Sequence, residues 1–316
     1  MRLAAVILLP GLVVAPVSAS DDSAEGRAVS FLSQEVPRWP RENQCFSCHN
    51  NGDAARALFA ATRARYEVPP EAIASTLEWL SSPESWADQK GEEAFSDVVL
   101  TRIQFASALS DASMSGLVDR ADALPEAVRL VASDQQADGS WRLDASSSIG
   151  SPATYGITLA SATAVVVLSR TDPERYRVEI DRGGAFLRGV EIKTVLDAAS
   201  VLIGLVGAPD GKAMAQRARC LEVIADGRAP SGGWGPYVTS RPEPFDTALV
   251  VLSLIATGGA RELIESGRAF LLDRQLDDGS WVETTRPAGQ ASYAQYISTT
   301  GWALLALIES KAFLSE

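Results

Sequence analysis

Tryptophan residues recur along this chain at a spacing close to 47 residues. Trp39 and Trp86 are 47 residues apart, Trp234 and Trp281 are also 47 apart, and Trp141 precedes Trp234 by 93 residues, nearly two periods. The four residues that end at Trp141 and the four that end at Trp281 are both Asp-Gly-Ser-Trp. Self-similarity with a period of about 20–50 residues is typical of repeat architectures. The spacing therefore predicts a chain built from about six similar units.

Each unit combines an amphipathic segment before the tryptophan with an almost wholly apolar segment after it. A segment that is apolar all round is buried on every side, whereas a single apolar stripe indicates a helix on the outside. Strand signals are scarce, and Pro70 and Pro125 each precede Glu-Ala, as in the first turn of a helix. The pattern predicts an all-α fold with an inner and an outer helix per unit, closed into a double ring. The apolar segments are 158–168, 194–206, 247–255 and 299–308.

Two of these units resemble the QW repeats of squalene-hopene cyclases and related terpene cyclases. That pattern runs from a basic–Gly pair through an aromatic residue to Gln and Gly-x-Trp; residues 267–281 match it, and residues 135–141 match its second half. The resemblance implies a single (α/α)6 toroid domain over residues 20–316, a fold shared with protein prenyltransferases, with a central cavity among the loops before the inner helices. It also implies that the repeat Gln and Trp side chains are structural and tie outer helices together: Gln34, Gln135, Gln275, Trp39, Trp141, Trp234 and Trp281.

The acid motif of these cyclases is altered here. The family protonates an alkene with the central aspartate of Asp-x-Asp-Asp-Thr-Ala, and the best match, residues 243–248, has Phe245 at that position. Squalene cyclisation is therefore not expected, and a chain with one histidine does not supply the zinc ligands of a protein prenyltransferase. Asp246 is the remaining catalytic candidate, although an aspartate at the start of an apolar helix also caps it or stabilises its first turn. The same helix-start interpretation applies to Asp97 and Asp197.

One segment, Cys45-Phe-Ser-Cys48-His49, contains two of the three cysteines and the only histidine. Its spacing is that of covalent haem attachment, in which Cys45 and Cys48 form thioethers and His49 is the proximal ligand of the iron. The pattern predicts one haem c, with a local disulfide or half of a zinc site as alternatives. Met114 is the candidate for the distal ligand, and Met214 is the other remaining sulfur.

The position of this segment within its repeat predicts where it lies. It follows Trp39 by six to ten residues, and residues 240–244 follow Trp234 by the same distance. In a cyclase-like repeat this loop approaches the mouth of the cavity. Residues from Asp53 to Arg65 then form the inner helix of the first unit. A haem attached here would sit at or over the central pocket.

The N-terminus has the features of a signal peptide over residues 1–19, namely Arg2, an apolar stretch and small residues before the cleavage site. This predicts export, as in a periplasmic protein, and no later apolar run reaches the length of a membrane span. The net charge of −12, without a basic stripe, argues against nucleic-acid binding. Cys220 lies in an apolar helical pattern and is expected to be a buried free thiol.

These observations lead to three functional hypotheses. The first is an exported toroid that carries one haem c and serves electron transfer or redox chemistry at the mouth of the cavity, with a redox partner protein. The second is a non-haem, squalene-cyclase-like protein that binds or converts a terpenoid or lipid, with a hydrophobic small molecule in the cavity. The third is an interaction scaffold. The haem segment favours the first, whereas the repeats do not distinguish among them.

Overall fold

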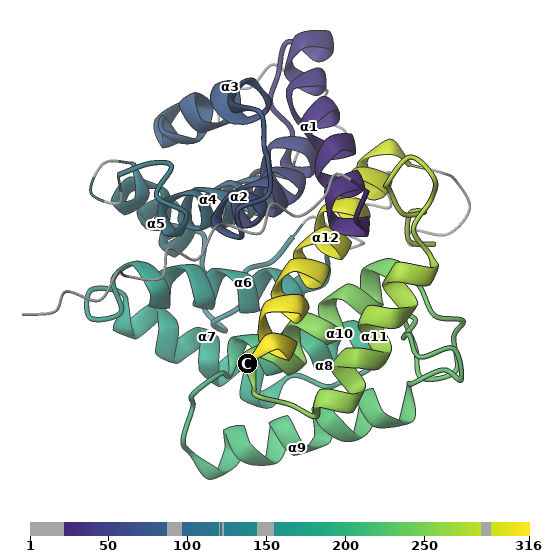
Figure 1. Ribbon diagram of the computed structural model, residues 1–316. Helices are drawn as coiled ribbons and strands as arrows, with labels where there is room; N and C mark the ends of the chain where they lie inside the picture. Colours follow the sequence, from purple (N-terminus) through teal and green to yellow (C-terminus); the bar gives the residue numbers. More distant parts are fainter. Residues whose placement is uncertain (1–21, 87–96, 120, 122, 144–154, 286–291) are drawn as a thin grey trace, which may run out of the picture.

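The computed structural model describes residues 22–86, 97–119, 121, 123–143, 155–285 and 292–316, and within these ranges every regular element is a helix. Helices of two kinds alternate along the chain (Figure 1). The outer helices are α1 (Ala24–Asn43), α3 (Pro70–Leu80), α5 (Leu124–Ser133), α7 (Arg177–Gly189), α9 (Gly211–Asp226) and α11 (Arg261–Asp273). The inner ones are η1 (Cys48–Ala54) continued by α2 (Ala55–Arg63), α4 (Val98–Met114), α6 (Gly156–Thr171), α8 (Val195–Gly204), α10 (Pro244–Ala256) and α12 (Tyr293–Ser315). A short 3₁₀ turn, η2 (Pro83–Ser85), follows α3.

The inner helices form a closed ring. Each packs against the next, from η1 and α2 through α4, α6, α8 and α10 to α12, and α12 returns to contact η1, α2 and α1, as Figure 1 shows. Their sequences explain this placement, because α10, for example, buries every residue from Pro244 to Val251. The structure thus confirms the predicted all-α toroid and the four predicted inner segments. Pro70 and Pro125 both lie in the first turn of a helix, as predicted.

The QW residues connect neighbouring units. Gln135 Nε2 donates to the carbonyl of Glu179 in α7 at 2.8 Å, and Gln275 Nε2 donates to that of Ala24 at 2.7 Å, which ties α11 to α1. The indole Nε1 of three buried tryptophans donates to a carbonyl ten residues earlier, on the outer helix of the same unit. The rings also lie against the next outer helix, since a Cβ at Gly183 in α7 or at Gly267 in α11 would lie 3.0 Å from a tryptophan ring. The structural role implied for these residues is therefore confirmed. The three tryptophans are Trp141, Trp234 and Trp281.

A glycine permits the close contact between the last unit and the first. Gly279 has a φ of +93°, and a Cβ at this position would lie 2.5 Å from the backbone carbon of Arg27 in α1. Only glycine adopts this conformation without strain and lets the loop approach the next outer helix so closely. The turn at residues 278–281 therefore joins the last unit of the ring to the first.

The first unit departs from this pattern. Helix α1 continues through Pro37 and Pro40 to Asn43, so Trp39 lies on the helix instead of in a loop after it. Its ring stacks on that of Tyr293, with centroids 5.5 Å apart, and Gln34 is exposed. The tie between outer helices predicted for Gln34 and Trp39 is thus wrong, because Gln34 faces solvent and Trp39 packs on Tyr293 of the inner helix α12. An unpredicted tie occurs in α9, where Gln216 Nε2 donates to the carbonyl of Val190 at 2.7 Å.

Several smaller predictions are confirmed. Asp97 is the N-cap of α4 and accepts from Leu100 N at 2.7 Å, and Asp197 completes a capping box with Thr194 at the start of α8. Cys220 is a fully buried free thiol in α9. In the described ranges, no helix is long and apolar enough to cross a bilayer. The predicted signal peptide, residues 1–19, lies outside these ranges, and export stays a prediction.

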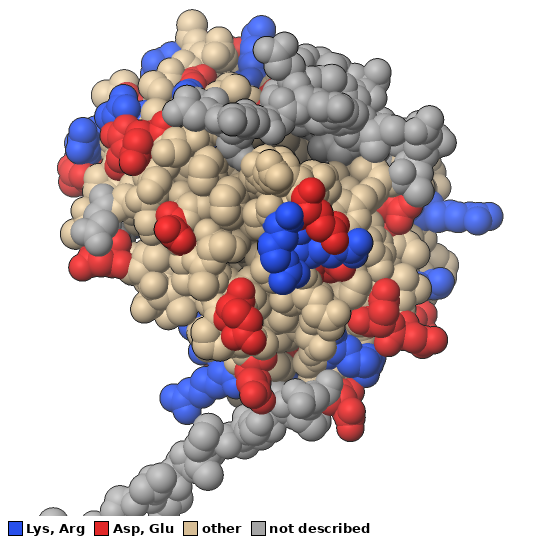
Figure 2. All heavy atoms as spheres, turned by 90° about the horizontal axis from the view of Figure 1, so that it is seen from above, with Lys and Arg blue, Asp and Glu red and all other residues tan. Residues whose placement is uncertain are grey.

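Charged side chains are spread over the surface of the ring. On the face drawn in Figure 2, acidic and basic residues lie close to one another between wide uncharged areas. Oppositely charged neighbours of this kind form surface ion pairs such as Arg38 with Glu35 and Glu42, both at 3.0 Å. Exposed pairs of this type contribute little to stability.

Candidate functional site at the mouth of the ring

A small cavity lies where the N-terminal ends of the inner helices meet. Its volume is about 20 Å³, which is enough for one water molecule or one group of similar size. Five inner segments supply its wall, each from the first turns of a helix or the residue before it. The lining residues are Cys48, His49, Asp53, Leu100, Gln104, Tyr155, Phe245, Ala294, Gln295 and Ser298.

Asp53 is the buried acid of this cavity. Its side chain is only 3% exposed, and its Oδ2 accepts hydrogen bonds from Gln104 Nε2 and Ser298 Oγ, both at 2.8 Å. The hydroxyl of Tyr155 lies 3.4 Å from Oδ1. Burial raises the pKa of Asp53 to about 6, although the charge of Arg56 and the hydrogen bonds from Ser298 and Gln104 act in the opposite direction. This carboxyl group can therefore hold or release a proton near neutral pH.

The turn that carries Asp53 is anchored by two asparagines. In η1, a π-helical turn, Asn51 Nδ2 donates to Thr76 Oγ1 in α3 at 2.8 Å, and Asn50 Nδ2 donates to the Glu35 carbonyl in α1 at 2.7 Å. Both asparagines are fully buried. Such turns are rare and often occur at functional sites, because they redirect side chains that an α-helix would place elsewhere. The anchored turn directs Asp53 into the cavity.

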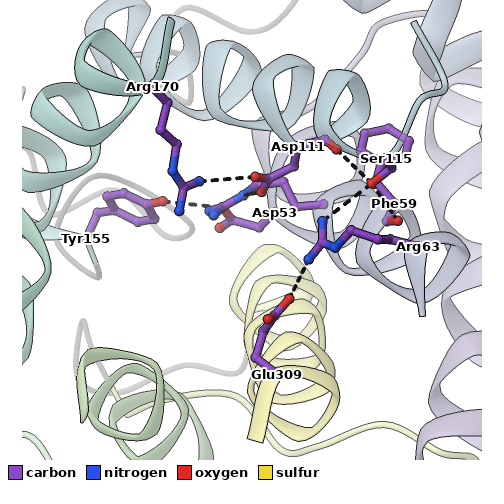
Figure 3. A network of polar contacts seen from close by, with 9 residues as sticks. Asp53, Phe59, Arg63, Asp111, Ser115, Tyr155, Arg170 and Glu309 are labelled. Carbon is purple, nitrogen blue, oxygen red and sulfur yellow. Dashed lines mark hydrogen bonds and ion pairs between the residues drawn. The ribbon is translucent and has the colours of Figure 1, made fainter. Parts of the chain in front are cut away.

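An ion-pair network lies next to Asp53 (Figure 3). Arg56 Nε contacts Asp111 Oδ2 at 2.8 Å, and Arg170 Nη1 contacts Asp111 Oδ1 at 3.5 Å. The guanidinium of Arg56 also lies over the ring of Trp302, 4.9 Å from its centroid. Arg56 and Asp111 are both buried, and the pair therefore needs this close geometry to offset the cost of removing two charges from water. The network places a positive charge beside the acid.

Aromatic rings complete the site. The centroid of Trp302 lies 6.1 Å from that of Tyr155 and 6.3 Å from that of Phe245. Burial and the nearby Asp53 raise the pKa of Tyr155 well above its ordinary value, so its hydroxyl stays neutral. Aromatic faces attract cations, and neutral rings also give a hydrophobic ligand an apolar wall.

The segment of Cys45, Cys48 and His49 lies at the mouth of the ring, since Cys48 and His49 line the cavity. The haem prediction, however, is wrong. The His49 ring packs edge-on against Trp39 and Tyr293, with centroids 4.6 and 5.8 Å away, and burial lowers its pKa to about 4. The cavity that it lines, about 20 Å³, is far too small for a porphyrin. The residues present do not fit a haem.

Met114, the candidate for the distal ligand, and Met214, the other methionine considered, both lie away from the cavity. Met114 is 47% exposed at the last residue of α4, ten residues beyond Gln104 and therefore about 15 Å further along the helix axis. Met214 is 54% exposed on the outer helix α9. The predicted redox partner loses its basis together with the haem.

The alternatives for the cysteine segment are not supported either. Cys45 and Cys48 are free thiols, and burial together with the charge of Asp53 raises the pKa of Cys48 to about 12. Among the described residues, no group of three or more His, Cys, Asp or Glu is placed to hold a metal ion.

Asp246, the catalytic candidate from the sequence, lies in the first turn of α10 and is 1% exposed. Its neighbour Phe245 lines the cavity, whereas Asp246 does not. The N-cap position of α10 is occupied by Glu243. A catalytic role for Asp246 stays a prediction. The sequence reasoning missed Asp53 as an acid, although residues 54–61, which follow it, are all apolar except Arg56 and so indicate a charge at the start of a buried helix.

No protein-family model matches this chain. Among curated proteins, it is similar to the lanosterol synthase erg7A of Aspergillus fumigatus, with 29% identity over 161 residues. The match covers 49% of this chain and 17% of the relative, so this chain spans less than two thirds of that protein's length. The relative therefore suggests an architecture and does not by itself establish an activity.

Solved structures with this fold include three of known class. Type II terpene cyclase MstE from Scytonema, in complex with geranylgeranyl dihydroxybenzoate, has a TM-score of 0.61 and 14% identity, over 92% of this chain and 97% of that one. An ent-copalyl diphosphate synthase from Streptomyces platensis has a TM-score of 0.52 and 18% identity, over 82% of this chain and 50% of that one. A polysaccharide lyase has a TM-score of 0.52 and 12% identity, over 93% of this chain and 99% of that one.

This chain has a terpene-cyclase-like toroid fold. Because a lyase shares the architecture, the fold alone does not decide the chemistry, which depends on the residues at the site. Those residues contain a buried acid and aromatic rings beside a small cavity.

Proposed function

We propose that this protein binds an isoprenoid-type hydrophobic ligand at the mouth of the ring, without haem, and that Asp53 donates a proton to the end of the ligand that enters the cavity. The observation that carries the proposal is a carboxyl group 3% exposed, with a pKa of about 6, in a cavity walled by Tyr155 and Phe245. The terpene cyclase fold neighbours support it. The cavity volume of about 20 Å³ admits one group of about the size of a water molecule, so a single carbon of the double bond reaches Asp53 and the rest of the ligand stays at the mouth of the ring.

The proton transfer balances without an oxidant or reductant. The proton of Asp53 adds to one carbon of a ligand double bond, whose π electrons form the new C–H bond and leave a cation on the other carbon. Asp53 becomes a carboxylate, which Gln104, Ser298 and the charge of Arg56 stabilise. The nearby rings of Tyr155 and Trp302 stabilise the cation. Loss of a proton to water from an adjacent carbon ends the reaction, and solvent returns a proton to Asp53.

The test measures binding and turnover separately. The protein is titrated with farnesol, geranylgeraniol and squalene while tryptophan fluorescence is recorded, and it is then incubated with each in D₂O while products are analysed by mass spectrometry. We expect binding of at least one ligand and incorporation of deuterium from solvent into product. Asp53→Asn should keep the binding within about threefold and abolish the incorporation, because an amide cannot supply the proton.

Asp197→Asn is the matched control. Asp197 caps α8 and accepts from Thr158 Oγ1 at 2.7 Å, so its replacement should lower stability and leave deuterium incorporation unchanged. Incorporation that vanishes in Asp246→Asn but persists in Asp53→Asn would assign the acid role to Asp246. Failure of all three ligands to bind would refute the proposed function.

A further inference from the structure

Asp53 and Arg56 have the spacing of an ion pair, yet they do not form one. Helix α2 continues directly from η1, and an acid and an arginine three positions apart lie on one face of a helix. Helical side chains lean toward the N-terminus, which directs Arg56 back to Asp53. In the part of the chain that the structure describes, the ion-pair partner of Arg56 is instead Asp111, with Nε 2.8 Å from Oδ2. The guanidinium is therefore held by another helix.

The position of Asp111 in α4 explains where the guanidinium is held. Gln104, which donates to Asp53 at 2.8 Å, lies seven residues before Asp111, and seven residues span about 10 Å of an α-helix. The N-terminal ends of the inner helices form the mouth of the ring, so Asp111 lies deeper in the ring than Asp53. The Arg56 side chain is drawn in the same direction, away from the cavity.

Burial and further contacts keep Arg56 in this position. Asp111 is 6% exposed and Arg56 is 8% exposed. Arg170 Nη1 lies 3.5 Å from Asp111 Oδ1, as Figure 3 shows, and the Arg56 guanidinium lies 4.9 Å from the centroid of Trp302. Separating a buried ion pair is costly because it leaves an uncompensated charge in a medium of low dielectric constant. The charge of Asp111 therefore fixes the place of Arg56.

Other ionisable groups near Asp53 do not compete for Arg56. On the turn that carries Asp53, burial raises the pKa of the Cys48 thiol to about 12 and lowers that of the His49 imidazole to about 4, so both are neutral near pH 7. Two tyrosines have raised pKa values and are neutral as well, and two acids on neighbouring helices are engaged in a surface ion pair or a helix cap. These four residues are Tyr155, Tyr293, Glu35 and Asp97.

We propose that Asp111 is a positioning residue that holds the Arg56 guanidinium away from Asp53, so that Asp53 stays a protonated acid instead of becoming one half of an ion pair. This inference rests on the proposed function, in which Asp53 donates a proton. At its present distance the charge of Arg56 lowers the pKa of Asp53 less than burial raises it, whereas a cation in direct contact lowers the pKa of a carboxyl group by about 1 to 3. Without the charge of Asp111, Arg56 returns to Asp53 and the acid is lost.

The test is the titration of Asp53 in the full chain. Protein with ¹³C-labelled aspartate carboxyl groups is followed by NMR from pH 3 to pH 8, and Asp53→Asn assigns the signal. In the wild type Asp53 should titrate near pH 6. In Asp111→Asn its pKa should fall by about 1 or more, and deuterium incorporation at pH 7 should fall about tenfold, because about a tenth as much of the acid is protonated. A merely structural role for Asp111 would not move this pKa.

Two further variants separate the charge of Arg56 from other effects. In Arg56→Met/Asp111→Leu both charges are absent, and the pKa of Asp53 should lie at or above its wild-type value. Asp134→Asn is the matched control, since Asp134 pairs with another arginine of α4, Arg102, at 2.7 Å, and this variant should leave the pKa of Asp53 within about 0.3 of the wild-type value. A pKa of Asp53 that is unchanged in Asp111→Asn, or equally lowered in the double variant, would overturn the inference and leave the proposed function intact. Absence of deuterium incorporation in the wild type would refute the function, whereas the titration would still decide the place of Arg56.

A measurement on the wild type needs no variant. The Nε–H resonance of Arg56 should keep its hydrogen-bonded position from pH 5 to pH 8, while Asp53 ionises, because Asp111 continues to hold the guanidinium. Loss of this hydrogen bond as Asp53 ionises would also overturn the inference, since Arg56 would then pair with Asp53 in spite of Asp111.

Discussion

The raised pKa of Asp53 predicts how the stability of this protein depends on pH. The folded state raises this pKa from 3.8 to about 6, and each unit corresponds to 1.36 kcal/mol, so the shift amounts to about 3 kcal/mol. Between these two values the folded state binds more protons than the unfolded state, and stability falls as pH rises. The stabilisation from protonated Asp53 is therefore complete below pH 3.8 and lost above about pH 6.

The perturbation is Asp53→Asn, which keeps the shape of the side chain and removes its charge. The free energy of unfolding is measured by urea titration from pH 4 to pH 8 for the wild type and the variant. We expect the variant to gain up to about 3 kcal/mol relative to the wild type between pH 4 and pH 7, because it no longer carries a buried charge at neutral pH. The difference between the two curves isolates Asp53 from the other titrating groups.

Asp210→Asn provides a control of opposite sign. Asp210 caps α9, and its hydrogen bond from Arg188, at 2.7 Å, is the main cause of a pKa lowered to about 2. A lowered pKa stabilises the folded state at neutral pH, so this variant should lose stability at pH 7. If the difference between Asp53→Asn and the wild type were the same at pH 4.5 and pH 7.5, Asp53 would not have a raised pKa, and its role as a proton donor near neutrality would be wrong.

Two further predictions concern the ring itself. Gly301→Ala should lower stability by about 1–3 kcal/mol in a thermal melt, because the new Cβ would lie 2.9 Å from the Ala54 Cα, where α12 packs on η1. Gly211→Ala is the control and should not lower stability, because a Cβ there meets nothing within 4 Å. Equal losses in both variants would contradict the packing argument. Arg56→Met should cost about 3–5 kcal/mol in urea unfolding because it leaves the buried Asp111 without its closest cation, and a loss below about 1 kcal/mol would mean that solvent reaches the pair.

The fold could be predicted from the sequence because the signal is repeated. The apolar segments at 158–168, 247–255 and 299–308 lie within inner helices, and 194–206 contains the inner helix α8. The glutamines before the two Asp-Gly-Ser-Trp turns join outer helices as expected. Similar local patterns recur from unit to unit, so a helix that is weakly predicted in one unit can be assigned by comparison with the others. The first unit is the exception, because α1 continues past Trp39 despite two prolines, and local propensity did not indicate this.

The site was less predictable because its residues come from different units. Asp53 and Gln104 are 51 positions apart and Asp53 and Ser298 are 245 apart, yet both pairs form 2.8 Å hydrogen bonds between inner helices that are neighbours in the closed ring. Sequence alone identified the mouth of the ring and the segment at residues 45–49 that approaches it. It did not identify the acid, because a raised pKa arises from burial and partners that only the closed ring brings together.

The sequence by itself determined the helical repeat, the inner and outer layers and the place of the cysteine–histidine segment, since these depend on periodicity and on short-range chemistry. Only the tertiary structure decided what that segment can do. Spacing alone allows Cys45, Cys48 and His49 to attach a haem, but closure of the ring packs the imidazole of His49 against Trp39 and Tyr293 and leaves about 20 Å³ beside it. A cofactor needs volume as well as ligands, and volume depends on how distant helices pack together.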